Sequence, residues 1–211
     1  MKQILILLIS VILFSCSDSE IKYHIDEVSF PNDTLTYLKS DMSLLNGVVY
    51  SELGELGEFI NGEREGRHKR WYENGQLHYD KNWINGKKEG EFKGWYENGQ
   101  LMFESNYKND KNVDGITKSY YENGQLKLEF NYLNGEFDGL NTMWWENGNI
   151  QNKVIFKLGI RNGINEMYYE NGQLMGSLSY KDGEFDGLCV TYTEMGEKIG
   201  EIMYQNGEKI K

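Results

Sequence analysis

The chain has 211 residues, of which 33 are acidic and 22 are basic, so its formal charge is −11 at neutral pH. This charge repels phosphate groups, and it argues against nucleic acid or an anionic membrane surface as a ligand. Aromatic residues make up 14% of the chain, which argues against an acidic disordered polymer and for a packed fold.

Residues 1–15 have the pattern of a signal peptide. Lys2 precedes an apolar run, residues 4–14, that is too short to cross a bilayer as a helix of about 20 residues. The stretch LFSC resembles the lipobox of bacterial lipoproteins, in which an aliphatic residue lies three positions before the cysteine and a small residue just before it. We therefore expect Cys16 to be the lipid attachment site. An ordinary cleaved signal followed by a chance cysteine is the alternative.

Several acyl chains on one residue give stable anchoring, so the lipobox predicts a chain that is lipid-anchored in the cell envelope. The acidic run at residues 17–20 resembles the signal that carries such lipoproteins to the cell surface, so the outer membrane or the cell surface is the expected location. With Cys16 acylated, Cys189 has no disulfide partner, and we expect it to be a small buried hydrophobic residue.

Two segments are expected between the signal and the repeats. Residues 16–33 are predicted to be a tether that ends near Pro31, the only proline. Residues 34–65 are predicted to contain N-terminal capping strands and a degenerate repeat, because the terminal unit of a repeat array is expected to be atypical.

Residues 66–211 contain six copies of one unit. The core WYENGQL at Trp71 recurs with small changes, and a glycine opens each copy at intervals of 24 or 25 residues. The opening glycines are Gly66, Gly90, Gly115, Gly139, Gly163 and Gly187. A fixed period in this range predicts a repeat architecture.

The Asn-Gly pair in each core predicts a β-hairpin with a two-residue type I′ turn. With Asn74 and Gly75 in the turn, Glu73 faces Gln76, Tyr72 faces Leu77 and Trp71 faces His78. The next connection, such as residues 85–90, is expected to be a longer glycine-rich turn.

The same register can be tested on the later repeats. It places Lys93 opposite Glu104 and Lys118 opposite Glu129, which are favourable cross-strand pairs. It also places an aromatic ring opposite each of the first five opening glycines, an arrangement that covers exposed backbone. Because a shift by one residue would destroy both patterns, we take the register as fixed.

The register separates two faces. The first, called the apolar face, is predicted to carry Tyr72, Leu77, Tyr79, Trp83, Tyr96, Leu101, Phe103, Tyr107, Tyr121, Leu126, Leu128, Phe130 and Tyr132. The second, called the charged face, carries the lysine–acid pairs and one ring per repeat. These rings form the aromatic stripe: Trp71, Trp95, Tyr120, Trp144, Tyr168 and Tyr192. The predicted fold is all-β, an elongated antiparallel β-meander of repeated hairpins with about 13 strands in one twisted sheet.

The unit resembles the MORN-type repeat, in the variant found in the YwqK-family antitoxins of bacterial toxin–antitoxin systems. The resemblance covers residues 47–211 and departs from the pattern at Asp110, which replaces a turn glycine, and at Met195, which replaces the asparagine of the core. It implies an open antiparallel β-meander and a role in interaction, without an activity. Antitoxins ordinarily act in the cytoplasm, so the label fits a secreted chain poorly and is taken as a family name.

No catalytic or cofactor-binding motif is present in the sequence, and no cofactor is expected. The register places His68 and His78 on opposite faces, so no zinc pair is expected. The repeated Glu73, Glu97, Glu122, Glu146 and Glu170 are interpreted as exposed turn residues, not as an acid–base row. The acidic pairs in EFDG lack the dense ligand series of a calcium loop.

The sequence therefore favours a non-enzymatic, envelope-anchored repeat scaffold that binds a protein partner. One alternative is a glycan or cell-wall binding module that uses the aromatic stripe. Another is an antitoxin-like inhibitor of a toxin partner. The stripe is the candidate partner-binding surface, but its rings could instead pack on their neighbours and rigidify the sheet.

Overall fold

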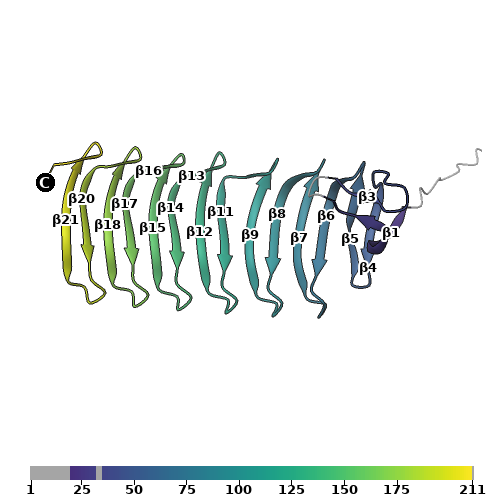
Figure 1. Ribbon diagram of the computed structural model, residues 1–211, viewed down its shortest axis with the longest axis horizontal. Coiled ribbons are helices and arrows are strands. Elements are labelled where there is room, and N and C mark those ends of the chain that lie inside the picture. The colour runs from purple at the N-terminus through teal and green to yellow at the C-terminus, as the bar shows by residue number, and fades with distance from the viewer. Residues whose placement is uncertain (1–19, 32–34, 211) are drawn as a thin grey trace, which may run out of the picture.

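The computed structural model describes residues 20–31 and 35–210. Most of them form one long open β-sheet whose strands lie side by side across the long axis (Figure 1), and a two-stranded sheet lies at its N-terminal end, which confirms the all-β prediction. The strand count over these residues is 22, higher than the 13 or so expected. The one helical segment described is a three-residue 3-10 turn, η1 (Ile25–Glu27). Over the same residues, no helix is long and apolar enough to cross a membrane.

A compact cap closes the N-terminal end of the sheet. Its strands are β1 (Lys22–His24), β2 (Val28–Ser29), β3 (Tyr37–Leu38), β4 (Gly47–Ser51) and β5 (Gly54–Ile60). The core consists of buried side chains from these strands and from the loop between β3 and β4: Val28, Leu45, Val49, Leu56 and Phe59. This cap holds the most deeply buried apolar side chains of the described chain.

The tether prediction is wrong for residues 22–29. Lys22–His24 pair in parallel with Val48, Val49 and Tyr50, and Val28 is buried in the core of the cap. This short stretch has no sequence periodicity that predicts a strand. It is ordered by pairing with an edge of the sheet that lies about 26 residues further along the chain.

Twelve long strands follow and form the repeat array, each pairing antiparallel with the next. They are β6 (Glu63–Trp71), β7 (Leu77–Ile84), β8 (Lys87–Trp95), β9 (Leu101–Lys108), β11 (Gly115–Tyr120), β12 (Leu126–Leu133), β14 (Gly139–Trp144), β15 (Ile150–Lys157), β17 (Gly163–Tyr168), β18 (Leu174–Lys181), β20 (Gly187–Tyr192) and β21 (Lys198–Gln205). Among the described residues, no helix or second sheet covers β7–β21 (Figure 1).

Five two-residue strands explain much of the higher count. They are β10 (Lys111–Asn112), β13 (Glu136–Phe137), β16 (Ile160–Arg161), β19 (Glu184–Phe185) and β22 (Glu208–Lys209). The first four each precede a long strand and are separated from it by an irregular step at the residue before the opening glycine. There Asp138, for example, donates its backbone N–H to Asn131 instead of continuing the regular ladder.

The predicted register holds away from the turns. Lys93 pairs with Glu104, and Lys118 pairs with Glu129. The opening glycines pair with rings as expected, for example Gly139 with Phe156. The sequence pattern therefore identified the correct strand alignment along most of each hairpin.

The predicted type of turn at the core is wrong. Gly75 donates to the carbonyl of Tyr72, and the N–H of Tyr72 donates to the carbonyl of Gln76, each at 2.9 Å. Gly75 has φ +83°, while Asn74 is not among the residues with positive φ. These features define a three-residue loop, a type I turn followed by a left-handed glycine in a bulge. The loops that contain residues 73–75, 97–99, 122–124, 146–148 and 170–172 are called the Glu-Asn-Gly turns.

The bulge exchanges two side chains between the faces. Trp71 pairs with Leu77, and the register shifts between Arg70 and Trp71. His78, predicted opposite Trp71, instead lies with its ring 4.4 Å from that of Tyr72 on the apolar face. Leu77, predicted on the apolar face, lines a hollow of the charged face beside Trp95. The equivalent shift recurs in each later repeat, so the prediction is corrected for Leu101 and Leu126 as well.

The type I′ turn occurs at the second connection, which was expected to be longer. Asn85 and Gly86 have φ +49° and +71°, and Ile84 pairs directly with Lys87. The same two-residue turns recur at 109–110, 134–135, 158–159, 182–183 and 206–207. An acidic side chain of the preceding unit holds most of them; Glu65, for example, accepts from the N–H of Asn85 at 2.7 Å.

Side chains of each Glu-Asn-Gly turn bind the next repeat. The Nδ2 of Asn98 donates to the carbonyl of Glu122, and the Tyr96 hydroxyl donates to the carbonyl of Tyr120. Equivalent amide bonds start from Asn74, Asn123, Asn147 and Asn171, and equivalent ring bonds from Tyr72, Tyr121, Trp145 and Tyr169. These bonds fix the spacing between repeats.

Candidate functional site

The aromatic stripe occupies one register position throughout the array. Each of its rings is the last residue of a strand, from Trp71 of β6 to Tyr192 of β20. The first five of these strands lead into the Glu-Asn-Gly turns, and β20 leads into the corresponding turn at 194–196. All six are half-buried. Successive rings are separated by two strands, or about 10 Å along the sheet. The structure therefore brings the predicted residues together as a row on the charged face.

Several rings of the stripe have partners within the protein. Trp71 packs against the core of the cap. The hydroxyl of Tyr168 donates to Glu166 at 2.8 Å, and that of Tyr120 donates to Glu104 at 3.1 Å. Burial, followed by this hydrogen bond and the charge of Glu166, raises the pKa of Tyr168 to about 12. These contacts bring part of the stripe into the structural network of the sheet.

Charge pairs surround the stripe. Lys118 lies 3.9 Å from Glu129, and Lys153 lies 3.5 Å from Glu166. Lys93 is opposite Glu104, but its Nζ is closest to Glu91, at 2.6 Å. Such half-exposed pairs contribute roughly 0–1 kcal/mol each to the stability of the fold. Their main effect is to distribute charge along this face.

A hollow of about 570 Å³ lies beside Trp95 on the charged face. Its wall includes Leu77 and two ion pairs, Arg67 with Asp80 at 2.7 Å and Lys93 with Glu91. The hollow combines one aromatic ring with several charged and polar groups, and such groups can fix the orientation of a bound ligand.

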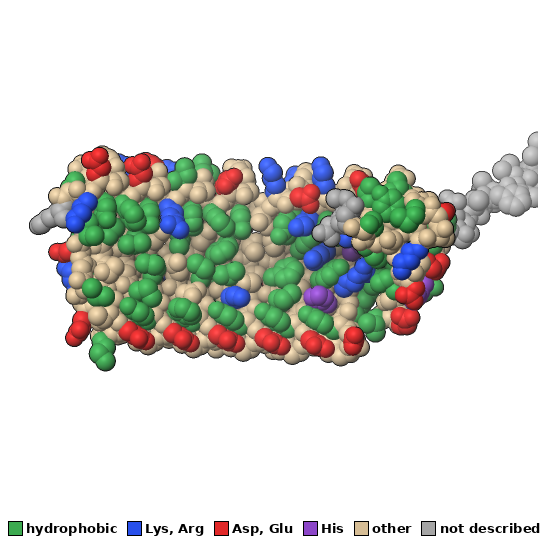
Figure 2. Space-filling model, viewed as in Figure 1, with side chains coloured by type: hydrophobic (Ala, Val, Ile, Leu, Met, Phe, Trp, Pro, Cys, Tyr) green, Lys and Arg blue, Asp and Glu red, His purple; other side chains and the backbone are tan. Residues whose placement is uncertain are grey.

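The repeated acidic residues have structural positions. Glu73, Glu97, Glu122, Glu146 and Glu170 are exposed in the turns. Figure 2 shows acidic side chains at regular intervals along the edge where these turns lie. The aspartates of the EFDG segments bind backbone; Asp138 accepts from the N–H of Leu158 at 3.0 Å. Over residues 20–31 and 35–210, no group of three His, Cys, Asp or Glu is arranged to hold a metal ion.

The histidines are not on opposite faces, because the bulge turns His78 toward the apolar face. His68 is buried against Phe59, and its Nε2–H donates to the carbonyl of Glu58 at 2.8 Å. Burial lowers the pKa of His68 to about 4. Cys189 is buried, as predicted, while Cys16 lies outside the described residues.

Sequence analysis missed a cluster of cations on the apolar face, formed by Arg64, Lys81 and Lys88. The signal was present in the repeats. Lys81 occupies a row that holds Ser105 in the next repeat and Phe130, Val154 and Leu178 in the repeats after it. A lysine in that row was an exception to the apolar pattern.

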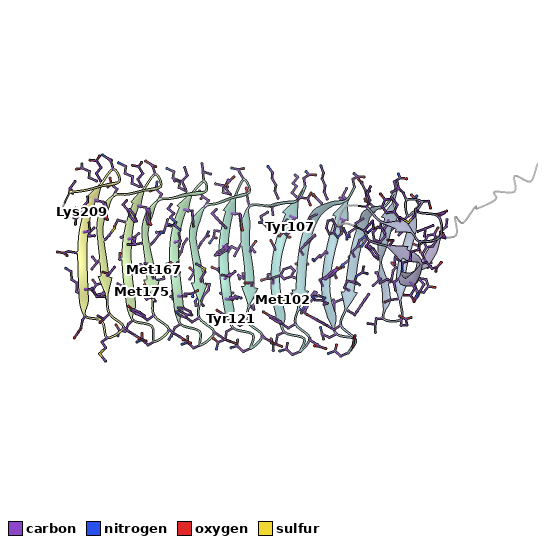
Figure 3. The ribbon with its side chains drawn as sticks, in the orientation of Figure 1. Met102, Tyr107, Tyr121, Met167, Met175 and Lys209 are labelled. Carbon is purple, nitrogen blue, oxygen red and sulfur yellow. The ribbon has the colours of Figure 1, made fainter. Side chains whose placement is uncertain are left out.

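Figure 3 labels Tyr107 and Tyr121, which lie toward opposite ends of the strands on the apolar face. Between them the strands run uncovered, and rings near the two-residue turns stack in sets, such as Phe92 with Tyr107 at 4.8 Å and Phe137 with Phe156 at 5.3 Å. Hairpins that are hydrogen-bonded to their neighbours at a constant spacing, in a sheet with two open faces, define a single-sheet β-repeat protein.

The model of the MORN repeat variant matches residues 64–85, 88–109, 113–134, 137–158 and 161–182. These matches span just over half of the chain, so the chain belongs to the MORN repeat variant family. No curated protein matches it. These matches confirm the MORN-type repeat that the sequence resemblance predicted.

Proposed function

We propose that this chain is a non-enzymatic repeat scaffold that binds a protein partner at the cell envelope. The observation that carries the proposal is the open sheet: β7–β21 present two faces that no other described layer covers. Eleven long strands of about seven residues make a face of roughly 24 Å by 50 Å. That area exceeds the roughly 800 Å² per partner that a stable protein interface needs.

The composition of these faces supports the same function. Half-exposed Trp and Tyr side chains recur along the whole sheet, and these residue types are enriched in protein interfaces. The inter-repeat bonds from Asn98 and Tyr96 preorganise the surface, which lowers the entropic cost of binding.

A lipid on Cys16 would hold this scaffold by one end. The chain enters the sheet at Lys22 in the cap, and β21 lies at the far end of the array (Figure 1). A partner could then bind along the array away from the membrane. An antitoxin-like role would be one case of this function, with a toxin as the partner.

Affinity capture from envelope extract tests the proposal. The full chain, immobilised through its C-terminus, is expected to retain a protein whose binding saturates and is competed by the free chain. A chain in which residues 64–182 are replaced by an unrelated β-repeat array is the control. Absence of a saturable protein ligand would contradict the scaffold function.

The hollow beside Trp95 favours a second candidate, a glycan-binding module on the charged face. If it is correct, Trp95→Ala together with Trp144→Ala will abolish retention on a glycan array. Unchanged retention in the double variant would remove this candidate.

A further inference from the structure

One pocket on the apolar face gathers positive charge. It has a volume of about 480 Å³ between β6, β7 and β8, and Arg64, Lys81 and Lys88 line it together with Tyr79 and Trp83. Each cation lies over a ring: Arg64 is 5.0 Å from the centre of Trp83, Lys81 is 4.3 Å from Tyr79, and Lys88 is 5.1 Å from Tyr107.

The two lysines have no carboxylate partner among the described residues. The ion pairs of the array involve Arg67, Lys93, Lys118, Lys153 and Lys198 instead. Asp110 also lines the pocket, but its carboxylate accepts from the backbone N–H of Lys88 at 2.9 Å. The Nζ atoms of both lysines lie within 6 Å of the centre of the Phe92 ring, in a partly desolvated space.

Two further observations favour an anion as the ligand of this pocket. Burial, together with the charges of Lys88 and Arg64, lowers the pKa of Lys81. The Nε1–H of Trp83 is covered from solvent and has no acceptor. An anion between the cations would relieve their mutual repulsion.

We propose that this pocket binds carboxylates of an acidic segment of the protein partner. The inference rests on the scaffold function proposed above and names the chemistry that the partner presents. Charge complementarity selects the occupant, since half-buried lysines that lack counter-ions favour an anionic group. The pocket opens onto the uncovered apolar face, where an extended chain can pass over the half-buried ring of Phe103.

The indole N–H signals of the five tryptophans give a direct readout by ¹H–¹⁵N NMR of the full chain. The probes are a hexaglutamate peptide, a hexaglutamine peptide and inorganic phosphate, at constant ionic strength. Trp83→Phe assigns the signal. We expect hexaglutamate to shift the Trp83 signal saturably while the Trp144 signal stays in place, and hexaglutamine to have no effect.

The double variant Lys81→Gln/Lys88→Gln is expected to weaken this binding by about tenfold or more. Lys157→Gln/Lys181→Gln removes the same charge from exposed positions far along the array and is expected to leave the affinity unchanged. The tryptophan spectrum of each variant shows that it remains folded. Absence of a saturable shift, equal loss in both double variants, or tighter binding of phosphate would overturn the inference.

The two proposals fail separately. If wild type and Lys81→Gln/Lys88→Gln capture the same partner equally, the pocket assignment is wrong and the scaffold function stands. If the peptide binds at Trp83 but no partner saturates on either chain, the scaffold function is wrong.

Discussion

The hydroxyl of Tyr96 lies 2.8 Å from the backbone carbonyl of Tyr120, and so joins one repeat to the next. Removing this donor leaves a partly buried carbonyl without a partner, so we expect Tyr96→Phe to lower the free energy of unfolding by about 1 kcal/mol. Denaturation by urea, followed by tryptophan fluorescence, measures the change.

Tyr107→Phe is the matched control, because the Tyr107 hydroxyl has no hydrogen bond to the described residues while its ring packs on Phe92. It is expected to change the stability little. Equal losses in both variants would show that the hydroxyl bond does not link the repeats.

We expect the backbone at Leu158 to be strained and a substitution to relieve that strain. It has φ +48° in a two-residue turn where the other repeats have Asn or Asp, and a left-handed backbone costs roughly 1–2 kcal/mol for an ordinary side chain. Its side chain is largely exposed, so little packing is lost. Leu158→Asn should therefore raise the melting temperature, as measured by circular dichroism.

The reverse change in the neighbouring turn is the control. Asn134 has φ +54°, and Asn134→Leu should lower the melting temperature by a similar amount. A decrease for Leu158→Asn would mean that the leucine makes a stabilising contact that outweighs the backbone strain.

His68 should make the fold sensitive to acid. Its pKa is about 4 in the folded state against about 6.5 in the unfolded chain, so the unfolded state binds more protons as the pH falls below 6.5. The stability that depends on neutral His68 is fully present above pH 6.5 and is lost as the pH falls toward 4. Between pH 7 and pH 5 the expected loss is about 2 kcal/mol.

Urea titrations at several pH values compare the wild type with His68→Gln, which cannot titrate. The variant is expected to be less stable at pH 7 and to lose less stability at pH 5. His24→Gln is the control, since that ring lies near the surface beside Glu52. A parallel pH dependence in His68→Gln and wild type would exclude His68 as the cause.

Membrane attachment depends on Cys16 if the lipobox resemblance is correct. Cys16→Ala should move the protein from the membrane fraction to the soluble fraction, because the acyl chains supply the anchoring energy. Fractionation and immunoblotting measure this, with Cys189→Ala as a control that stays attached. Retention of the Cys16→Ala protein in membranes would contradict lipid anchoring.

The sequence was sufficient to align the strands but not to assign the turns. Lysine–acid pairs such as Lys118 with Glu129 and rings opposite glycines are local consequences of a register, so they can be read from spacing alone. Both connections contain Asn-Gly, however. Asn74 bonds to the N–H of Gln76 and to Glu97 of the next repeat, and that second bond depends on the assembled array.

The cap and the cationic pocket were missed for a related reason. Lys22–His24 form a strand only because β4 offers a parallel edge, and the sequence of β1 does not encode that partner. Lys81 interrupts an apolar row of the repeats, but the sequence alone does not bring Lys88 beside it. Their proximity became evident only when β7 and β8 were placed beside each other.

The strands run across the long axis of the array, and this orientation determines its response to force. A pull along that axis loads the interstrand bonds one pair at a time, as in a zipper, and not all at once in shear. A molecule held at its cap and stretched from β21 should therefore extend in a series of similar steps at low force. Each repeat of 24 residues would release about 80 Å of chain.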